Sequence, residues 1–162
     1  MKKLIKNREI IEDTWTLIEE CESPDALPQG NIIVTLPIWQ KHANTLKQRK
    51  TPLGVLLASD EEPESIKDDL SELALVAINF PKFADGRGYS SAYELRSHLN
   101  FKGEIRAVGD VLRDQIFQME RCGFNSFAIR EDRSIEDALN AFNDFSFSYQ
   151  GDAKNSQPHF RR

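Results

Sequence analysis

The chain has 162 residues, of which 40% are hydrophobic and 29% are charged, and its formal net charge is -5. This length fits a single domain that buries about two-thirds of its unfolded surface in one core. The acidic balance argues against nucleic acid as a partner, because binding to a phosphate backbone requires basic surface.

Membrane and metal signatures are not evident in the sequence. The longest apolar stretch, residues 73–80, is far shorter than the ~20 residues that span a bilayer, and the basic residues Lys2 and Lys3 are not followed by a signal-peptide core. These features predict a cytoplasmic protein with no membrane segment. Cys21 and Cys122 show no C-x-x-C spacing, and the histidines show no metal-ligand spacing, so we expect neither a metal site nor a recognisable cofactor motif.

The first 20 residues predict a short hairpin. The apolar pairs within residues 3–5 and 10–11 flank a polar turn, and the chain then runs on to Trp15. Residues 21–31 contain two prolines and a glycine, which is typical of a linker to the main body.

Strand and helix signals then alternate from residue 32 to residue 145. The predicted strands cover residues 32–36, 53–58, 73–79, 105–108 and 127–129. The predicted helices cover residues 37–49, 65–70 and 91–99, a stretch that follows Asp110 and stops at Gly123, and a last one from Ser134 to about residue 145. Helix-capping patterns are expected at Ser65, Ser91, Asp110 and Ser134.

Five successive strand–helix units predict an α/β fold with a mostly parallel sheet and right-handed crossovers. A closed eight-unit barrel typically takes ~250 residues, so the chain is too short for one. Two alternatives stay open: an open layered sheet, or a partial barrel that covers its exposed edges by forming a homodimer. We expect residues 1–150 to form one domain and residues 151–162 to be a disordered tail.

The loop after the third predicted strand is the first candidate site. Gly86 and Gly88 permit positive φ and close approach of a ligand, and the loop delivers the amino end of the next helix, which favours an anion. Arg87 and Lys82 would reinforce anion binding. The alternative interpretation is a plain turn in which Asp85 bonds to the backbone and Arg87 forms a salt bridge.

The loop after the fourth predicted strand should adjoin the first, because neighbouring parallel strands end at the same edge of a sheet. There Asp110 and Arg113 would meet Asp85 and Arg87, although Asp110 also suits a helix cap and Arg113 an ordinary ion pair. The predicted anion- or partner-binding site comprises Lys82, Asp85, Gly86, Arg87, Gly88, Ser90, Asp110 and Arg113.

Two long phrases, DLSELALVAINFPKFADGRGYSSAYELR and FKGEIRAVGDVLRDQIFQMERCGFNSFAIRED, resemble a bacterial family known as domain of unknown function nine hundred thirty-four. The resemblance runs from the hairpin to Gln150 and is densest over residues 79–124. Members are usually encoded beside the assimilatory sulfite reductase and are commonly described as probable oxidoreductases of sulfite reduction.

The resemblance therefore implies a role in sulfite reduction, with sulfite reductase or its electron donor as the partner. The first hypothesis is an accessory protein that supports electron delivery and docks through a charged face, either the acidic segment 60–72 or the basic segment 96–121. The second is an enzyme that acts on a small anionic substrate, with Arg87 and Arg113 as clamps and Asp85 or Asp110 as base.

Overall fold

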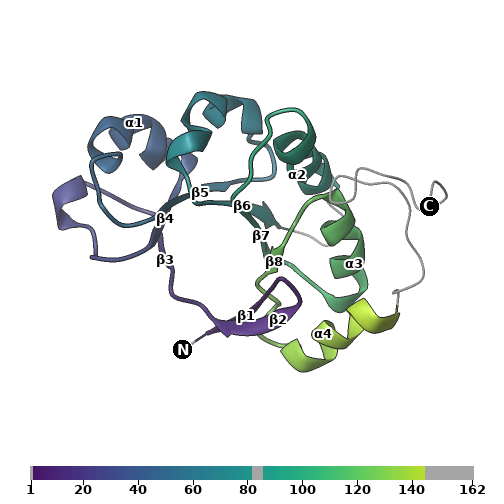
Figure 1. The fold of residues 1–162 in the computed structure, drawn as a ribbon. Helices are drawn as coiled ribbons and strands as arrows, with labels where there is room; N and C mark the ends of the chain where they lie inside the picture. The colour runs from purple at the N-terminus through teal and green to yellow at the C-terminus, as the bar shows by residue number, and fades with distance from the viewer. Residues whose placement is uncertain (1, 82–85, 145–162) are drawn as a thin grey trace.

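The computed structural model describes residues 2–81 and 86–144, which fold into a curled sheet with helices on its outer face (Figure 1). Its strands are β1 (Lys3–Lys6), β2 (Glu9–Glu12), β3 (Thr16–Ile18), β4 (Ile32–Thr35), β5 (Leu53–Leu57), β6 (Leu75–Phe80), β7 (Glu104–Gly109) and β8 (Ser126–Phe127). Its α-helices are α1 (Leu36–Leu46), α2 (Arg87–Ser97), α3 (Arg113–Cys122) and α4 (Ile135–Asp144), and two 3-10 segments are η1 (Pro24–Ala26) and η2 (Pro63–Glu72).

The sheet has eight strands in the order β2-β1-β8-β7-β6-β5-β4-β3. The strands from β3 to β8 run parallel, whereas β1 lies antiparallel to both β2 and β8. Figure 1 shows the sheet bent into a half-barrel, with the β1–β2 hairpin below β8 and the chain passing from β2 to β3 across the open side. Among the described residues, the helices therefore cover the convex face and leave the concave face uncovered.

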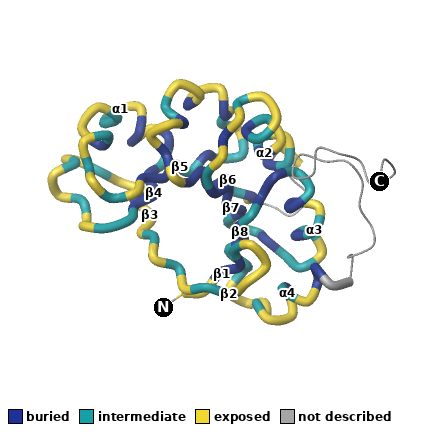
Figure 2. Tube along the Cα trace, viewed as in Figure 1, coloured by how far each residue is buried: buried dark blue, intermediate teal, exposed yellow. Residues whose placement is uncertain are grey.

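The alternation of side chains along the strands separates two apolar clusters. In β6, Val76, Ile78 and Phe80 belong to the large core between the sheet and the helices. Leu75 and Ala77 point the other way, into a small cluster with Ile33 on the concave face. Figure 2 shows the buried strands on the inner side of the helices, whose outer surfaces are exposed.

The prediction of an α/β fold with a mostly parallel sheet is confirmed, and the sheet takes the form of a half-barrel. The sheet has more strands than predicted, because β3 lies in a stretch assigned to the N-terminal piece. The antiparallel hairpin is present as expected. The expected disordered tail lies outside the described residues.

Three of the four predicted helix caps are wrong. Helix α2 begins at Arg87, so Ser91 lies inside it. The segment η2 begins at Pro63, two residues before Ser65. Helix α3 is preceded by Leu112, and its N-cap makes no side-chain hydrogen bond. The cap at Ser134 is confirmed, since its hydroxyl oxygen accepts a hydrogen bond from the Asp137 N–H at 3.1 Å.

The hairpin is fixed to the helical layer through its turn. Asn7 and Arg8 adopt positive φ values of 52° and 66°, as the tight turn between β1 and β2 requires. The Arg8 guanidinium donates to both carboxylate oxygens of the buried Glu120 in α3, at 3.0 and 2.7 Å. This hydrogen bonding raises the pKa of Arg8. The contact therefore joins the first turn of the chain to its third α-helix.

Across residues 2–81 and 86–144, every helix falls short of the length and apolar character that crossing a bilayer requires.

Candidate functional site

A cavity of about 890 Å³ opens on the concave face at the carboxyl ends of the parallel strands. It is lined by Lys2, Lys3, Leu4, Asp13, Trp15, Leu17, Ile33, Leu56, Ala77, Arg106, Val108, Gly109, Ala128, Ile129, Arg130, Glu131, Asp132, Arg133 and Ile135. Closed βα barrels hold their active sites at this same end of the strands. The cavity is therefore the candidate functional site, and we refer to it as the upper cavity.

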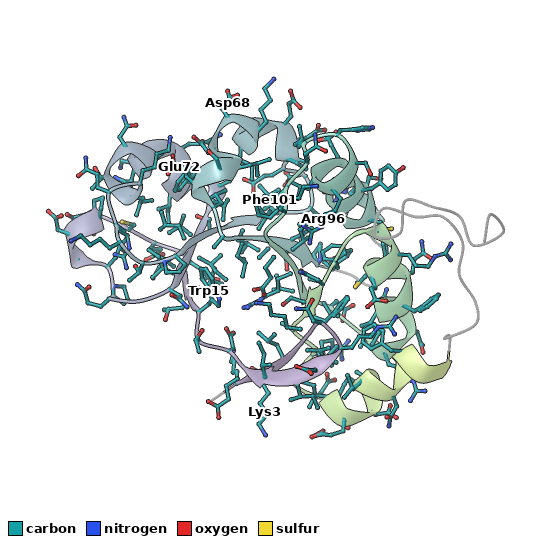
Figure 3. The ribbon with its side chains drawn as sticks, in the orientation of Figure 1. Lys3, Trp15, Asp68, Glu72, Arg96 and Phe101 are labelled. Carbon is teal, nitrogen blue, oxygen red and sulfur yellow. The ribbon has the colours of Figure 1, made fainter. Side chains whose placement is uncertain are left out.

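The wall of the upper cavity is mostly apolar. Leu56, Ala77 and Val108 face it from the centre of the sheet, and Trp15 and Leu17 face it from the edge. Leu17 is 45% exposed, so this apolar surface remains in contact with water. Figure 3 shows the Trp15 side chain within the space that the strands surround. Such a wall suits a ligand with an apolar body.

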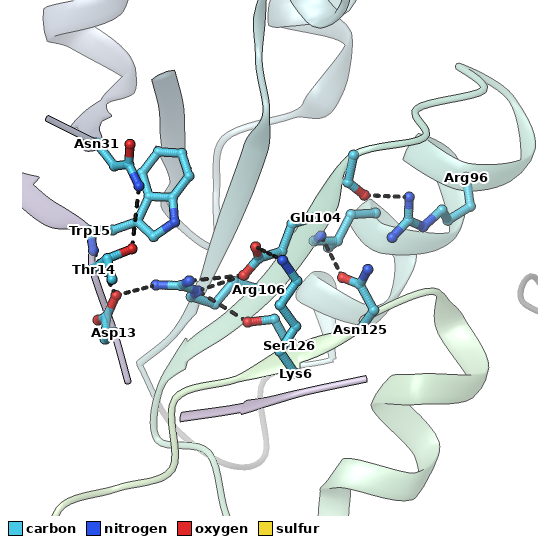
Figure 4. A network of polar contacts seen from close by, with 12 residues as sticks. Lys6, Asp13, Thr14, Trp15, Asn31, Arg96, Glu104, Arg106, Asn125 and Ser126 are labelled. Carbon is cyan, nitrogen blue, oxygen red and sulfur yellow. Dashed lines mark hydrogen bonds and ion pairs between the residues drawn. The ribbon is translucent and has the colours of Figure 1, made fainter. Parts of the chain in front are cut away.

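Arg106 forms the floor of the cavity and is only 3% exposed. It lies on the concave side of β7, where its guanidinium donates to a Glu104 carboxylate oxygen at 2.9 and 3.1 Å and to the Ser126 hydroxyl at 3.1 Å. Its third nitrogen donates to the Asp13 carboxylate at 3.1 Å (Figure 4). Four hydrogen bonds therefore hold the buried guanidinium in one orientation.

Glu104 supplies the main countercharge of Arg106. Burial disfavours ionisation of its carboxyl, but the nearby Arg106 charge, the Ser126 hydroxyl and Lys6 outweigh burial and leave the pKa of Glu104 below its ordinary value. The Lys6 ammonium lies 3.2 Å from the second carboxylate oxygen. Both charges at the floor are therefore compensated within the fold.

A second, smaller cavity of about 450 Å³ lies at the amino ends of the strands, and we refer to it as the lower cavity. Its lining includes Pro52, Ala74 and Asn125, which stand just before β5, β6 and β8. Arg106 and Trp15 line both cavities. These two side chains therefore form the partition between the two ends of the half-barrel.

Arg130 organises the rim of the upper cavity. Its guanidinium donates to the Asp110 carboxylate at 2.7 Å and binds both carboxylate oxygens of Asp132. These hydrogen bonds, first to Asp132 and then to Asp110, raise the pKa of Arg130, and the same contact lowers the pKa of Asp132. The backbone N–H of Arg130 also donates to the Val111 carbonyl at 3.1 Å. Arg130 thus connects the loops that follow β7 and β8.

Other rim cations differ in how they are placed. The Lys2 ammonium forms an exposed ion pair with Glu131 at 3.2 Å. Lys3 points away from the interior of the half-barrel (Figure 3). Arg133 is exposed, and within the described residues its charge acts on the neighbouring Asp132, whose pKa it helps to lower, without a close ion pair. Arg133 is therefore the rim cation that is most available to a ligand.

Of the residues predicted in the first loop, Arg87 and Ser90 lie beside η2. Lys82 and Asp85 lie outside the described residues. Gly86 precedes α2 with an ordinary φ of -87°, so the positive φ expected there is absent. Arg87 donates to the Ser59 hydroxyl at 3.1 Å and borders a hollow of about 420 Å³ together with Ser90.

Gly88 has a packing role in α2. A Cβ at this position would lie 2.5 Å from the ring of Phe80, so the glycine allows the helix to approach β6 closely. The residue is buried and is not at the surface of a ligand loop.

Asp110 and Arg113 are bound to different partners. Asp110 accepts the hydrogen bond from Arg130, whereas the Arg113 guanidinium pairs with Asp137 of α4. Arg87 borders the hollow beside η2, and Asp110 lies beside the upper cavity. The combined anion site of the two loops stays a prediction.

Sequence reasoning missed Arg106, Arg130 and Trp15. Two signals in the sequence point to Arg106 and Arg130. Charged residues alternate with apolar ones in β7, which marks an inward polar face, and Arg130 follows the last parallel strand just as Asp110 follows the one before it. Within the described ranges, the His, Cys, Asp and Glu side chains form no group of three that could hold a metal ion.

Comparison with known proteins gives a family. The profile described as "Bacterial protein of unknown function (DUF934)" matches residues 54–160. The chain belongs to this family. The DUF934 match includes Arg106, Arg130 and Arg133, whereas Asp13 and Trp15 precede it. No curated protein and no solved structure matched the chain.

Proposed function

We propose that this DUF934 protein is an accessory protein of assimilatory sulfite reduction that supports electron delivery to sulfite reductase and binds an anion in the upper cavity. The role in this pathway is supported by the resemblance of two long sequence segments to proteins that are usually encoded beside the assimilatory sulfite reductase. The anion site rests on one observation, the cavity of about 890 Å³ at the carboxyl ends of the strands with a buried guanidinium as its floor.

The chemistry of the cavity supports an anion. Arg106 has five N–H groups, and its four contacts to Glu104, Ser126 and Asp13 occupy three of them, because the Nε–H is shared between Glu104 and Ser126. Arg133 adds an exposed positive charge at the rim. Because the wall around Arg106 is apolar, a charge-assisted hydrogen bond there would be stronger than one in open solvent.

The acidic 3-10 segment η2 supports docking of a partner. Asp68 lies at the outer edge of this segment (Figure 3). Asp68 and Glu72 are exposed, and so are Asp60 and Glu62, which precede η2. Exposed charges of one sign accelerate association with a surface of opposite charge and lose their effect at high salt. We therefore place the docking surface for a basic patch of the partner on η2.

A pull-down of sulfite reductase tests this role. We expect a complex at low salt that dissociates as the salt concentration rises, and a weaker complex with the double variant Asp68→Lys/Glu72→Lys. The matched control, Glu19→Lys/Glu22→Lys, reverses two exposed charges near η1 and should bind like the wild type. Failure to form a complex at low salt, or equal loss in both double variants, would rule out docking through η2.

The position of the upper cavity favours one alternative, an enzyme that acts on a small anionic substrate. Catalysis in closed βα barrels uses the same end of the strands. The two candidate sites are distinguished by substitution. Turnover in the upper cavity would be lost in Arg133→Ala, whereas turnover at the predicted loops would be lost in Arg87→Ala or Arg113→Ala with little change in thermal stability.

A further inference from the structure

The size of the upper cavity is large for an inorganic anion. Its volume of about 890 Å³ lies at the upper end of the range of roughly 300–1,000 Å³ that is usual for sites of drug- or cofactor-sized molecules. Sulfite or sulfate, with only a few heavy atoms, would touch the guanidinium at the floor and leave most of the wall in water. The volume therefore points to an organic ligand.

The lining separates into two chemically distinct parts. The wall carries Trp15, Leu17 and Leu56, and the exposure of 45% at Leu17 means that burying this surface would be favourable. The indole of Trp15 also offers a flat face on which a planar group can stack. The charged groups lie at the floor, Arg106, and at the rim, Arg133.

We infer that the ligand of the upper cavity is an amphipathic organic anion, with a planar apolar body that packs on Trp15 and the leucines and an acidic group that binds Arg106 or Arg133. This inference rests on the proposed binding role of the cavity and specifies the chemical class of its ligand. It distinguishes the ligand from sulfite itself.

The two tryptophans of the chain allow a direct measurement. Trp39 is buried in α1, where its indole N–H donates to Asp69 at 2.9 Å, so Trp39→Phe leaves Trp15 as the sole indole reporter. The probe is 8-anilino-1-naphthalenesulfonate, and its matched partner is N-phenyl-1-naphthylamine, which has the same aromatic body without the sulfonate. Both are titrated into folded Trp39→Phe protein while the Trp15 emission is followed.

We expect the sulfonate probe to quench Trp15 and to bind more tightly than the uncharged amine. Arg133→Ala should weaken the sulfonate about tenfold, the size of one charge-assisted hydrogen bond, and leave the amine unchanged. Lys102→Ala, which removes a positive charge from the lower cavity, is the matched control and should change neither. A cooperative thermal transition in each variant establishes that the probe reports on the native state.

The possible outcomes distinguish the inferred ligand class from the proposed anion-binding role of the upper cavity. Quenching by sulfite or sulfate without binding of either aromatic probe would overturn the inference and leave the anion-binding proposal standing. Equal binding of the two probes, unaffected by Arg133→Ala, would overturn both, because the cavity would then be apolar without anion recognition. A Trp15 signal that no added molecule changes would also overturn both.

Discussion

Among single residues, Arg106 shows how a charge is held inside a small protein. Its guanidinium is 3% exposed and is bound by carboxylates from β7 and from the segment before β3. Removing one partner of a buried ion pair costs far more than the pair contributes, because the other charge remains without compensation. The stability of the half-barrel should therefore depend on Glu104.

Glu104→Gln keeps the shape of the side chain and removes its charge. At neutral pH we expect the free energy of unfolding to fall by roughly 3 kcal/mol, since Arg106 and Lys6 lose their common partner. The folded-state pKa of Glu104 lies below its ordinary value of 4.5, so its stabilising effect is complete above that pH and is lost as the pH falls through the folded-state pKa. The difference from wild type should shrink in acid.

Urea unfolding at a series of pH values measures this difference. The control is Glu12→Gln, an exposed glutamate of β2, which should behave like the wild type throughout. A difference between Glu104→Gln and wild type that stays constant down to about pH 3 would contradict the assignment of the effect to the Glu104 charge.

At the scale of elements, the packing of α2 on β6 depends on Gly88, which has no side chain. Gly88→Ala would place a methyl group 2.5 Å from the Phe80 ring, and we expect a loss of about 1–3 kcal/mol from the resulting overpacking. Gly86→Ala, two residues earlier, meets no described atom within 4 Å at a φ of -87° and should be neutral or slightly stabilising. Thermal denaturation compares the two variants, and equal stability would contradict the packing role.

The elements also show what local sequence determines. All five predicted βα strands are present, because apolar runs between polar loops specify buried parallel strands. Strand β3 was missed because its three residues stand next to acidic ones and are paired only through β4. The cap predicted at Ser91 failed because the helix continues one turn further toward its amino end, to Arg87.

The candidate site was harder to predict than the strands. Asp13 and Arg106 are 93 residues apart, so their contact arises only when the sheet curls and brings the segment before β3 against β7. Asp110 follows its strand as predicted, and its carboxylate accepts a hydrogen bond from Arg130, a residue that the sequence analysis did not select. Local patterns locate strand ends, whereas the curvature of the sheet decides which ends share a cavity.

For the whole molecule, the upper cavity exists partly because the centre of the sheet presents a small side chain. Ala77 faces the cavity from β6, whereas Ala107 of β7 faces the packed core under the helices. Ala77→Val should fill part of the void, raise the free energy of unfolding by about 0.5–2 kcal/mol and weaken ligand binding. Ala107→Val should instead destabilise by about 1–3 kcal/mol. Calorimetry of both variants checks this contrast, and a destabilised Ala77→Val would show that the space is already filled.

Arg106 and Trp15 line both cavities, so their side chains stand between the two ends of the half-barrel. The concave face of the sheet is exposed to solvent beside the upper cavity, as the 45% exposure of Leu17 indicates. A partner protein that bound over this face would therefore also cover the ligand.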